Sequence, residues 1–141
     1  MKRYLVDTNV LIAIALGKSE VVQFIDLYQQ DDAVFFITLQ NICEFWNVAT
    51  RPEANNGLDL SPEFTMRALE RLQLGFKVLP ETSAVERELL QLLREHKVRG
   101  KQIYDARLAA TVRAHNLDGI LTLNHRDFLR YADVNPILPS A

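Results

Sequence analysis

Short, mainly apolar segments alternate along this chain with longer segments of helical periodicity. Residues 4–6, 34–37, 77–79 and 119–122 are rich in residue types that favour strands, and a last short strand is expected at 134–138. Strands that are apolar on both faces are typical of a parallel sheet covered by helices. The pattern therefore predicts an α/β fold, in which helices flank both faces of a central, mainly parallel β-sheet.

Helices are expected between the strands, because apolar residues recur there at intervals of three and four. Ser61 followed by Pro62 is a typical helix start, and Ser83 with Glu86 has the spacing of a capping box. The longest segment with the composition of a loop is 53–60. The predicted helices cover residues 9–16, 20–30, 39–49, a segment from 62 onward, 83–97 and 101–115, with a helical turn at 127–131.

The length of 141 residues suits a single domain spanning 1–141 that can bury a core. The chain has one cysteine, Cys43, which excludes an internal disulfide and a thiolate zinc cluster. We expect Cys43 to be a small buried apolar residue. No signal-peptide pattern is found, and no apolar stretch approaches the ~20 residues of a membrane span. We therefore expect a cytoplasmic protein with no membrane association.

Four acidic residues occupy positions that a parallel sheet would bring to one edge. Asp7 directly follows the first predicted strand, and Asp127 lies a few residues after the strand at 119–122. Glu44 lies in the helix after the second strand, and Asp105 lies near the start of the helix at 101–115. Since sites in parallel sheets form at the carboxyl ends of the strands, these acids can meet in one crevice.

Each acid also has a purely structural interpretation. Asp7 and Asp127 can cap the helical segments that follow them, Asp105 is favourable near a helix N-terminus, and Glu44 can occupy the edge of an amphipathic helix. Together, however, the acids lie near apolar segments without obvious basic partners, and burying unpaired carboxylates is costly. A bound divalent cation removes that cost. Oxygen ligands alone favour Mg²⁺, or Mn²⁺, over zinc.

Four segments resemble the conserved acidic motifs of the PIN domain family, and they occur in the family's order over essentially the whole chain. YLVDTNVLI at 4–12 resembles the family's opening, and QNICEFWN at 40–47 resembles its second acidic motif. YDARLAA at 104–110 and LTLNHRDF at 121–128 resemble the third and the last. The compact size resembles the VapC-type toxins of type II toxin–antitoxin pairs.

The resemblance implies a metal-dependent endoribonuclease. It makes Asp7, Glu44 and Asp105 the core metal-binding and catalytic acids, with Asp127 as the fourth. It also assigns to three polar residues a role in orienting ligands or contacting phosphate: Asn9, Thr122 and Asn124. It further implies a homodimer or larger assembly, and a cognate antitoxin protein that fills the active-site groove.

The expected chemistry is the hydrolysis of an RNA phosphodiester. Cations held by carboxylates can bind the phosphate and activate a water for in-line attack, which leaves a 5′-phosphate and a 3′-hydroxyl. The net charge of −2 argues against binding by bulk positive charge, but residues 94–113 carry six basic residues against two acidic ones. We expect Arg107 in this segment, and Arg51 after the helix of Glu44, to contact phosphate. Single-stranded or looped RNA is the expected substrate.

Two other functions are compatible with parts of the sequence. A strand followed by an early aspartate also resembles the phosphatases of the haloacid dehalogenase family, but Asn9 stands where that family has a second aspartate. The other alternative is a PIN-fold binding module without catalysis. The presence of all four acids argues against it, because a module that binds no metal need not keep them.

Overall fold

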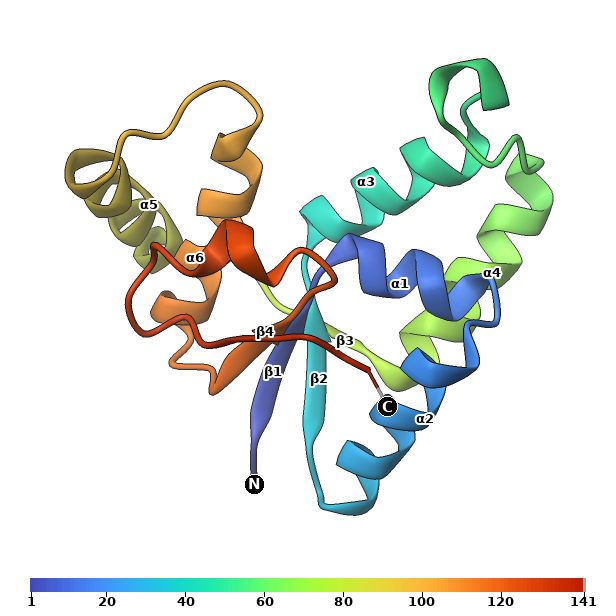
Figure 1. The fold of residues 1–141 in the computed structure, drawn as a ribbon, viewed down its shortest axis with the longest axis horizontal. Coiled ribbons are helices and arrows are strands. Elements are labelled where there is room, and N and C mark those ends of the chain that lie inside the picture. Colours follow the sequence, from blue (N-terminus) through green and yellow to red (C-terminus); the bar gives the residue numbers. More distant parts are fainter. Residues whose placement is uncertain (141) are drawn as a thin grey trace.

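Five short strands form the sheet of the computed structural model, which describes residues 1–140 (Figure 1). The strands are β1 (Arg3–Val6), β2 (Val34–Ile37), β3 (Lys77–Val78), β4 (Gly119–Leu121) and β5 (Pro136–Ile137). Their order is β3-β2-β1-β4-β5, and the four pairings are parallel. Strand β1 is central because its Leu5 pairs with Phe36 on one side and with Ile120 on the other.

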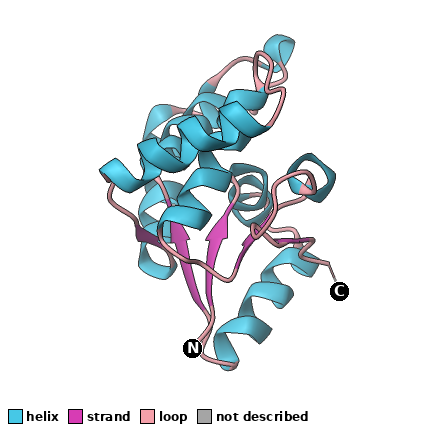
Figure 2. Cartoon of the chain, turned by 90° about the vertical axis from the view of Figure 1, so that its left-hand side faces the viewer, coloured by secondary structure: helices cyan, strands magenta, loops and turns pink. Residues whose placement is uncertain are grey.

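Within the described residues, six α-helices and two short 3₁₀ turns connect the strands. Helices α1 to α4 lie on one side of the sheet in Figure 1, and α5 and α6 lie on the other. Figure 2, turned by 90°, also shows helices on both sides of the strands. The expected α/β fold with helices on both faces is confirmed. The bounds are α1 (Thr8–Ala15), α2 (Ser19–Gln30), α3 (Leu39–Thr50), η1 (Glu53–Asn55), α4 (Pro62–Gly75), α5 (Ser83–Glu95), α6 (Gln102–Ala114) and η2 (His125–Phe128).

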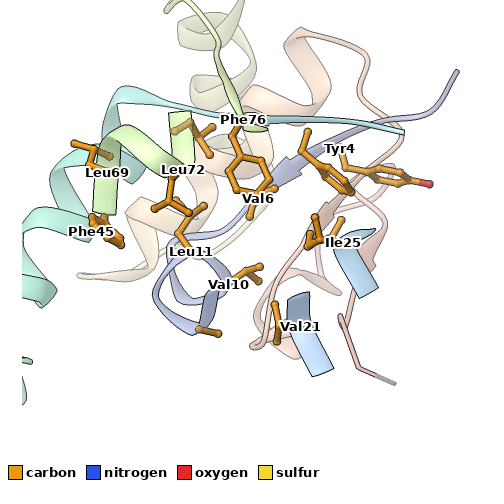
Figure 3. Packing of buried hydrophobic residues seen from close by; sticks show 14 of the residues in the cluster. Tyr4, Val6, Val10, Leu11, Val21, Ile25, Phe45, Leu69, Leu72 and Phe76 are labelled. Atoms are coloured by element: carbon orange, nitrogen blue, oxygen red, sulfur yellow. The ribbon is translucent and has the colours of Figure 1, made fainter. Parts of the chain in front are cut away.

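The alternation of side chains along β1 divides the core between the two faces of the sheet. Tyr4 and Val6 contribute to a cluster with residues of α1, α2 and α4, among them Val10, Ile25 and Leu72 (Figure 3). Leu5 points to the opposite face, where it belongs to a cluster with Leu92 of α5 and Leu108 of α6. Because successive strand residues face opposite sides, one buried strand anchors both layers of helices.

Of the two helix starts predicted from capping residues, one is confirmed. The Ser61 hydroxyl accepts a hydrogen bond from Phe64 N at 3.1 Å, with Pro62 in the first turn. The capping box predicted at Ser83 and Glu86 is wrong, because Ser83 is already inside the helix. Thr82 occupies the cap position without a side-chain bond, and its carbonyl accepts from Val85 N.

Other local expectations needed correction. The predicted loop 53–60 contains the turn η1, and the last strand is shorter than predicted. The turn predicted at 127–131 begins earlier, at His125. Cys43 is exposed, so the prediction of a buried residue is wrong: it lies on the face of α3 that points away from the core. None of the helices formed by residues 1–140 is long and apolar enough to cross a membrane.

The close approach of β5 to β4 requires a glycine. A Cβ added at Gly119 would lie 2.6 Å from the carbonyl oxygen of Asn135, which accepts the hydrogen bond from Ile120 N. We expect Gly119→Ala to lower the free energy of unfolding by about 1–3 kcal/mol, as overpacking does. Urea titration measures this.

Gly75→Ala is the matched control for this prediction. Gly75 ends α4, and the nearest atom to an added Cβ is Gln29 Nε2 at 4.0 Å. This variant should be as stable as the parent or up to about 1 kcal/mol more stable. Equal stabilities of Gly119→Ala and the parent would contradict the proposed close contact.

Candidate active site

The four predicted acids come from four different segments of the chain, and these segments meet at the carboxyl-terminal edge of the sheet. Asp7 comes directly after β1, and Glu44 lies in α3, which follows β2. Asp127 lies in η2, just after β4, and Asp105 lies in the first turn of α6. The order of the parallel strands thus brings acids from distant parts of the chain to one edge, as Figure 1 shows for the elements that carry them.

Asp7 is buried, with only 8% of its surface exposed, and both of its carboxylate oxygens are hydrogen-bonded. Oδ1 accepts from Thr8 N at 2.7 Å, and Oδ2 accepts from the Thr122 hydroxyl at 2.8 Å. Asp7 is also the N-cap of α1, with extended backbone angles. The structural and the functional interpretation of Asp7 are therefore compatible, since one residue begins the helix and faces the site.

Glu44 is held by a chain of polar side chains that crosses from α1 to α3. The Thr8 hydroxyl donates to Glu44 Oε1 at 3.2 Å and accepts from Asn41 Nδ2 at 3.1 Å. Asn41 in turn forms a capping box with Thr38 at the start of α3. The hydrogen bonds that begin this helix thus also position the hydroxyl group beside the acid.

Gln40 connects Glu44 to α6. Its Nε2 donates to Glu44 Oε1 at 3.1 Å and to the carbonyl oxygen of Tyr104, the residue before Asp105, at 3.0 Å. Its Oε1 is buried without a hydrogen-bond partner. Gln40 therefore links the helices of two of the acids and leaves one acceptor oxygen unpaired in the interior of the site.

The acids influence one another electrostatically. The pKa of the Asp7 carboxyl is raised to about 6, mainly by burial and to a smaller extent by the nearby charges of Glu44 and Asp127, while its two hydrogen bonds act to lower it. Burial also raises the pKa of Asp105 to about 6, as do the charges of Asp7, Asp127 and Glu44. The positive charge of Arg130 acts to lower the pKa of Asp105. The carboxylates are thus close enough to repel one another.

The three predicted orienting residues lie along the loop after β4 and the start of α1. Thr122 is fully buried, and its hydroxyl also accepts from Asn124 N at 3.0 Å. Asn9 Oδ1 accepts from Leu123 N at 3.1 Å. These contacts fasten the loop that carries Asp127 to the start of α1, so Thr122 and Asn9 have a positioning role. Contact of Asn124 and Asn9 with phosphate remains a prediction.

The two predicted phosphate-binding arginines have other partners. Arg51 lies at the end of α3, about 10 Å along the axis from Glu44, and its Nη2 donates to Asn56 O at 3.2 Å. Arg107 is half-buried and forms an ion pair with Glu81. Both guanidinium groups therefore stabilise neighbouring segments, and a role in binding phosphate remains a prediction for both.

Sequence reasoning missed the residues that hold the acids. The sequence analysis includes Thr8, Gln40 and Asn41 only within the quoted motifs and gives them no role, although Thr38 and Asn41 have the i, i+3 spacing of a capping box. That spacing could have indicated the start of α3. The link from Gln40 to Tyr104 could not have been predicted, because it depends on how closely α3 and α6 approach.

The donor set fits a hard divalent cation in its chemistry. The four acids and the unpaired Oε1 of Gln40 provide oxygen atoms alone, which suits Mg²⁺ or Mn²⁺. As positioned, however, no three of the His, Cys, Asp and Glu side chains within residues 1–140 form a group that could hold a metal ion. The acids thus converge on one edge without forming a closed ligand set, as expected for like charges that repel one another.

The buried Asp7 predicts how stability depends on pH. Because its pKa rises on folding from 3.8 to about 6, the folded protein binds more protons than the unfolded chain between these values. Its contribution to the free energy of unfolding is complete below pH ~4 and is lost as the pH rises through ~6, by about 1–3 kcal/mol.

Urea titrations with a chelator at pH 4.5 and pH 7 test this prediction on the parent and on Asp7→Asn. We expect a smaller pH dependence in Asp7→Asn, and greater stability than the parent at pH 7, since the repulsion is relieved. The same pH dependence in both proteins would show that Asp7 has an ordinary pKa.

Comparison with known proteins places the chain in a family. The sequence model of the PIN domain matches residues 4–134. A search of curated proteins found no match. Three solved structures illustrate the similarity of fold, and each match covers 96% of this chain. VapBC2 from Rickettsia felis, bound to a promoter DNA fragment, has a TM-score of 0.75 and 14% sequence identity, with 97% of that chain covered. VapBC-1 from nontypeable Haemophilus influenzae has a TM-score of 0.71, 18% identity and 96% coverage, and a toxin–antitoxin complex from Klebsiella pneumoniae has a TM-score of 0.68, 21% identity and 97% coverage. With its parallel sheet, its four acids at one edge and a match over nearly its whole length, the chain belongs to the PIN domain family.

Proposed function

We propose that the protein is a metal-dependent endoribonuclease. The observation that carries this proposal is the convergence of four acids at one sheet edge, where burial, together with the charges of the other acids, raises the pKa of Asp7 and of Asp105. A protein that retains such repulsion gains from a cation bound between the acids. Membership of the PIN domain family supports the same function, because nucleases of this family generally use a divalent metal.

We further propose that the protein is the toxin of a type II toxin–antitoxin pair. The structures that it resembles over 96% of its length include two VapBC complexes and one described as a toxin–antitoxin complex. These similarities support a cognate antitoxin protein as the partner. A homodimer or larger oligomer and a cytoplasmic location complete this proposal.

Asp7, Glu44 and Asp105 would hold the cation, with Asp127 beside them. When bound, Mg²⁺ or Mn²⁺ would polarise the phosphodiester and lower the pKa of a water molecule. The chain's own contribution is to fix the acids. Two hydrogen bonds hold Asp7, and Thr8 and Gln40 hold Glu44 at the same oxygen, so the carboxylates lose little freedom when the substrate binds.

The reaction uses water rather than an enzyme nucleophile or the 2′-hydroxyl of the RNA. The oxygen of water forms the new bond to phosphorus, the 3′-oxygen leaves, and the products carry a 5′-phosphate and a 3′-hydroxyl. Products that end in 2′,3′-cyclic phosphate would show that the 2′-hydroxyl attacks instead, and would contradict this mechanism.

RNA cleavage by the purified protein is the direct test. We expect cleavage of mixed cellular RNA with Mg²⁺ or Mn²⁺, none with a chelator, and a loss of at least about 100-fold in Asp7→Asn, because one ligand of the cation is removed. Gel electrophoresis measures the cleavage, and analysis of the product ends identifies the chemistry.

Asp31→Asn is the matched control, since it makes the same chemical change at an exposed position after α2, before β2. It should cleave like the parent. If folded parent protein without bound inhibitor cleaves no RNA, the alternative of a PIN-fold binding module replaces the nuclease. The family match to the PIN domain gives no support to the alternative of an aspartate-dependent phosphatase.

Metal binding can be tested separately from cleavage. Because a cation offsets the repulsion among the acids, we expect Mg²⁺ or Mn²⁺ to raise the melting temperature of the parent at pH 7.5. Asp7→Asn should show a much smaller increase, and Asp31→Asn the full one. Equal increases in all three proteins would mean that the cation binds elsewhere.

A further inference from the structure

A pocket of about 420 Å³ lies beside two of the four acids, between the start of α6 and η2. Asp105 and Asp127 line it on the side of the acids. Three basic residues, Lys101, Arg126 and Arg130, also line it. We call these three residues the basic pocket. They come from two segments of the chain that meet only in the folded protein.

The positive charges of the basic pocket are not neutralised by ion pairs. Within residues 1–140, none of its three side chains has a carboxylate within ion-pair distance. Arg130 is held in place by neutral partners, since its Nη2 donates to Gln102 Oε1 at 3.3 Å and to the Tyr131 hydroxyl at 3.1 Å. Its guanidinium also lies over the Tyr131 ring, 5.1 Å from the centroid. Arg130 is therefore oriented without losing its charge.

A second pocket beside the acids differs in charge. It also has a volume of about 420 Å³, and it is lined by Glu44, Tyr104 and Arg107, among others. The charge of Arg107 is already paired with Glu81. An RNA backbone that approaches the acids is repelled by them, and unpaired positive charge that offsets this repulsion lies on the side of η2.

We propose that the basic pocket binds the RNA phosphate next to the one that is cleaved, so that a single-stranded backbone reaches the acids across η2. This inference rests on the proposed ribonuclease function and adds a substrate-binding subsite to it. A positively charged groove that follows the backbone is the usual means of binding single strands without reading their sequence. Lys101 and Arg126 are exposed and free to contact phosphate, and Arg130 supplies an oriented charge in the pocket that Asp105 also lines.

The test measures the binding of fluorescent oligo(U) and oligo(A) RNA to the Asp7→Asn protein by anisotropy, in Mg²⁺ and at several salt concentrations. The Asp7→Asn background prevents cleavage during the measurement. We expect Lys101→Gln and Arg126→Gln each to weaken binding about fivefold at 0.1 M salt, and to reduce the slope of log K against log salt by about 0.7. The loss should be equal for the two RNAs, because phosphate contacts carry no sequence information.

Lys18→Gln is the control, because Lys18 is exposed at the start of α2 and also has no ion-pair partner within the described residues. It should bind like the background protein. If the parent cleaves RNA, but Lys101→Gln and Arg126→Gln leave the affinity and its salt dependence unchanged, the basic pocket does not bind phosphate. The proposed function would then remain intact. A parent that neither binds nor cleaves RNA would overturn both.

Discussion

The carboxylate of Asp7 is buried at the end of the central strand, and the arrangement of the neighbouring segments follows from how that charge is accommodated. One oxygen accepts from Thr8 N and the other from the Thr122 hydroxyl, so the end of β1 is tied to its own helix and to the segment after β4. These two bonds lower the pKa of Asp7 but do not offset its burial. The nearby charges of Glu44 and Asp127 add to the free-energy cost of keeping this buried carboxylate ionised.

Much of the fold could be predicted from the sequence because the signals are local. Apolar segments such as 34–37 can be buried on both faces only in a covered sheet, and Ser61 with Pro62 begins a helix in many contexts. The capping box predicted at Ser83 does not form, because the helix begins one residue earlier: the carbonyl of Thr82 accepts the hydrogen bond that closes the first turn. The spacing of Ser83 and Glu86 alone does not reveal this. Local spacing shows that a cap is possible, and the path of the preceding chain decides which residue is used.

The convergence of the four acids was predictable because Asp7 and Asp127 come after strands and Glu44 and Asp105 lie in the first half of helices, at an edge where strand order brings these elements together. Their partners were not predictable. Gln40 reaches the carbonyl of Tyr104 only because α3 and α6 meet at this edge, and Arg107 pairs with Glu81 across 26 positions of sequence. The excess of basic residues at 94–113 likewise did not predict which charges are free. Arg113 is paired with Glu88, whereas Arg126 and Arg130, outside that segment, line the pocket beside Asp105.

The position of β4 beside β1 has a consequence for the order in which this protein is synthesised. Thr122 lies 115 residues after Asp7, and Asp127 comes later still, so all six α-helices of the described residues are translated before either is available. Until β4 inserts, β1 has one open edge, and the Asp7 carboxylate lacks one of its two donors. A nascent chain on the ribosome therefore carries three of the four acids without the strand that completes their surroundings. The site is assembled only when β4 and η2 have left the exit tunnel.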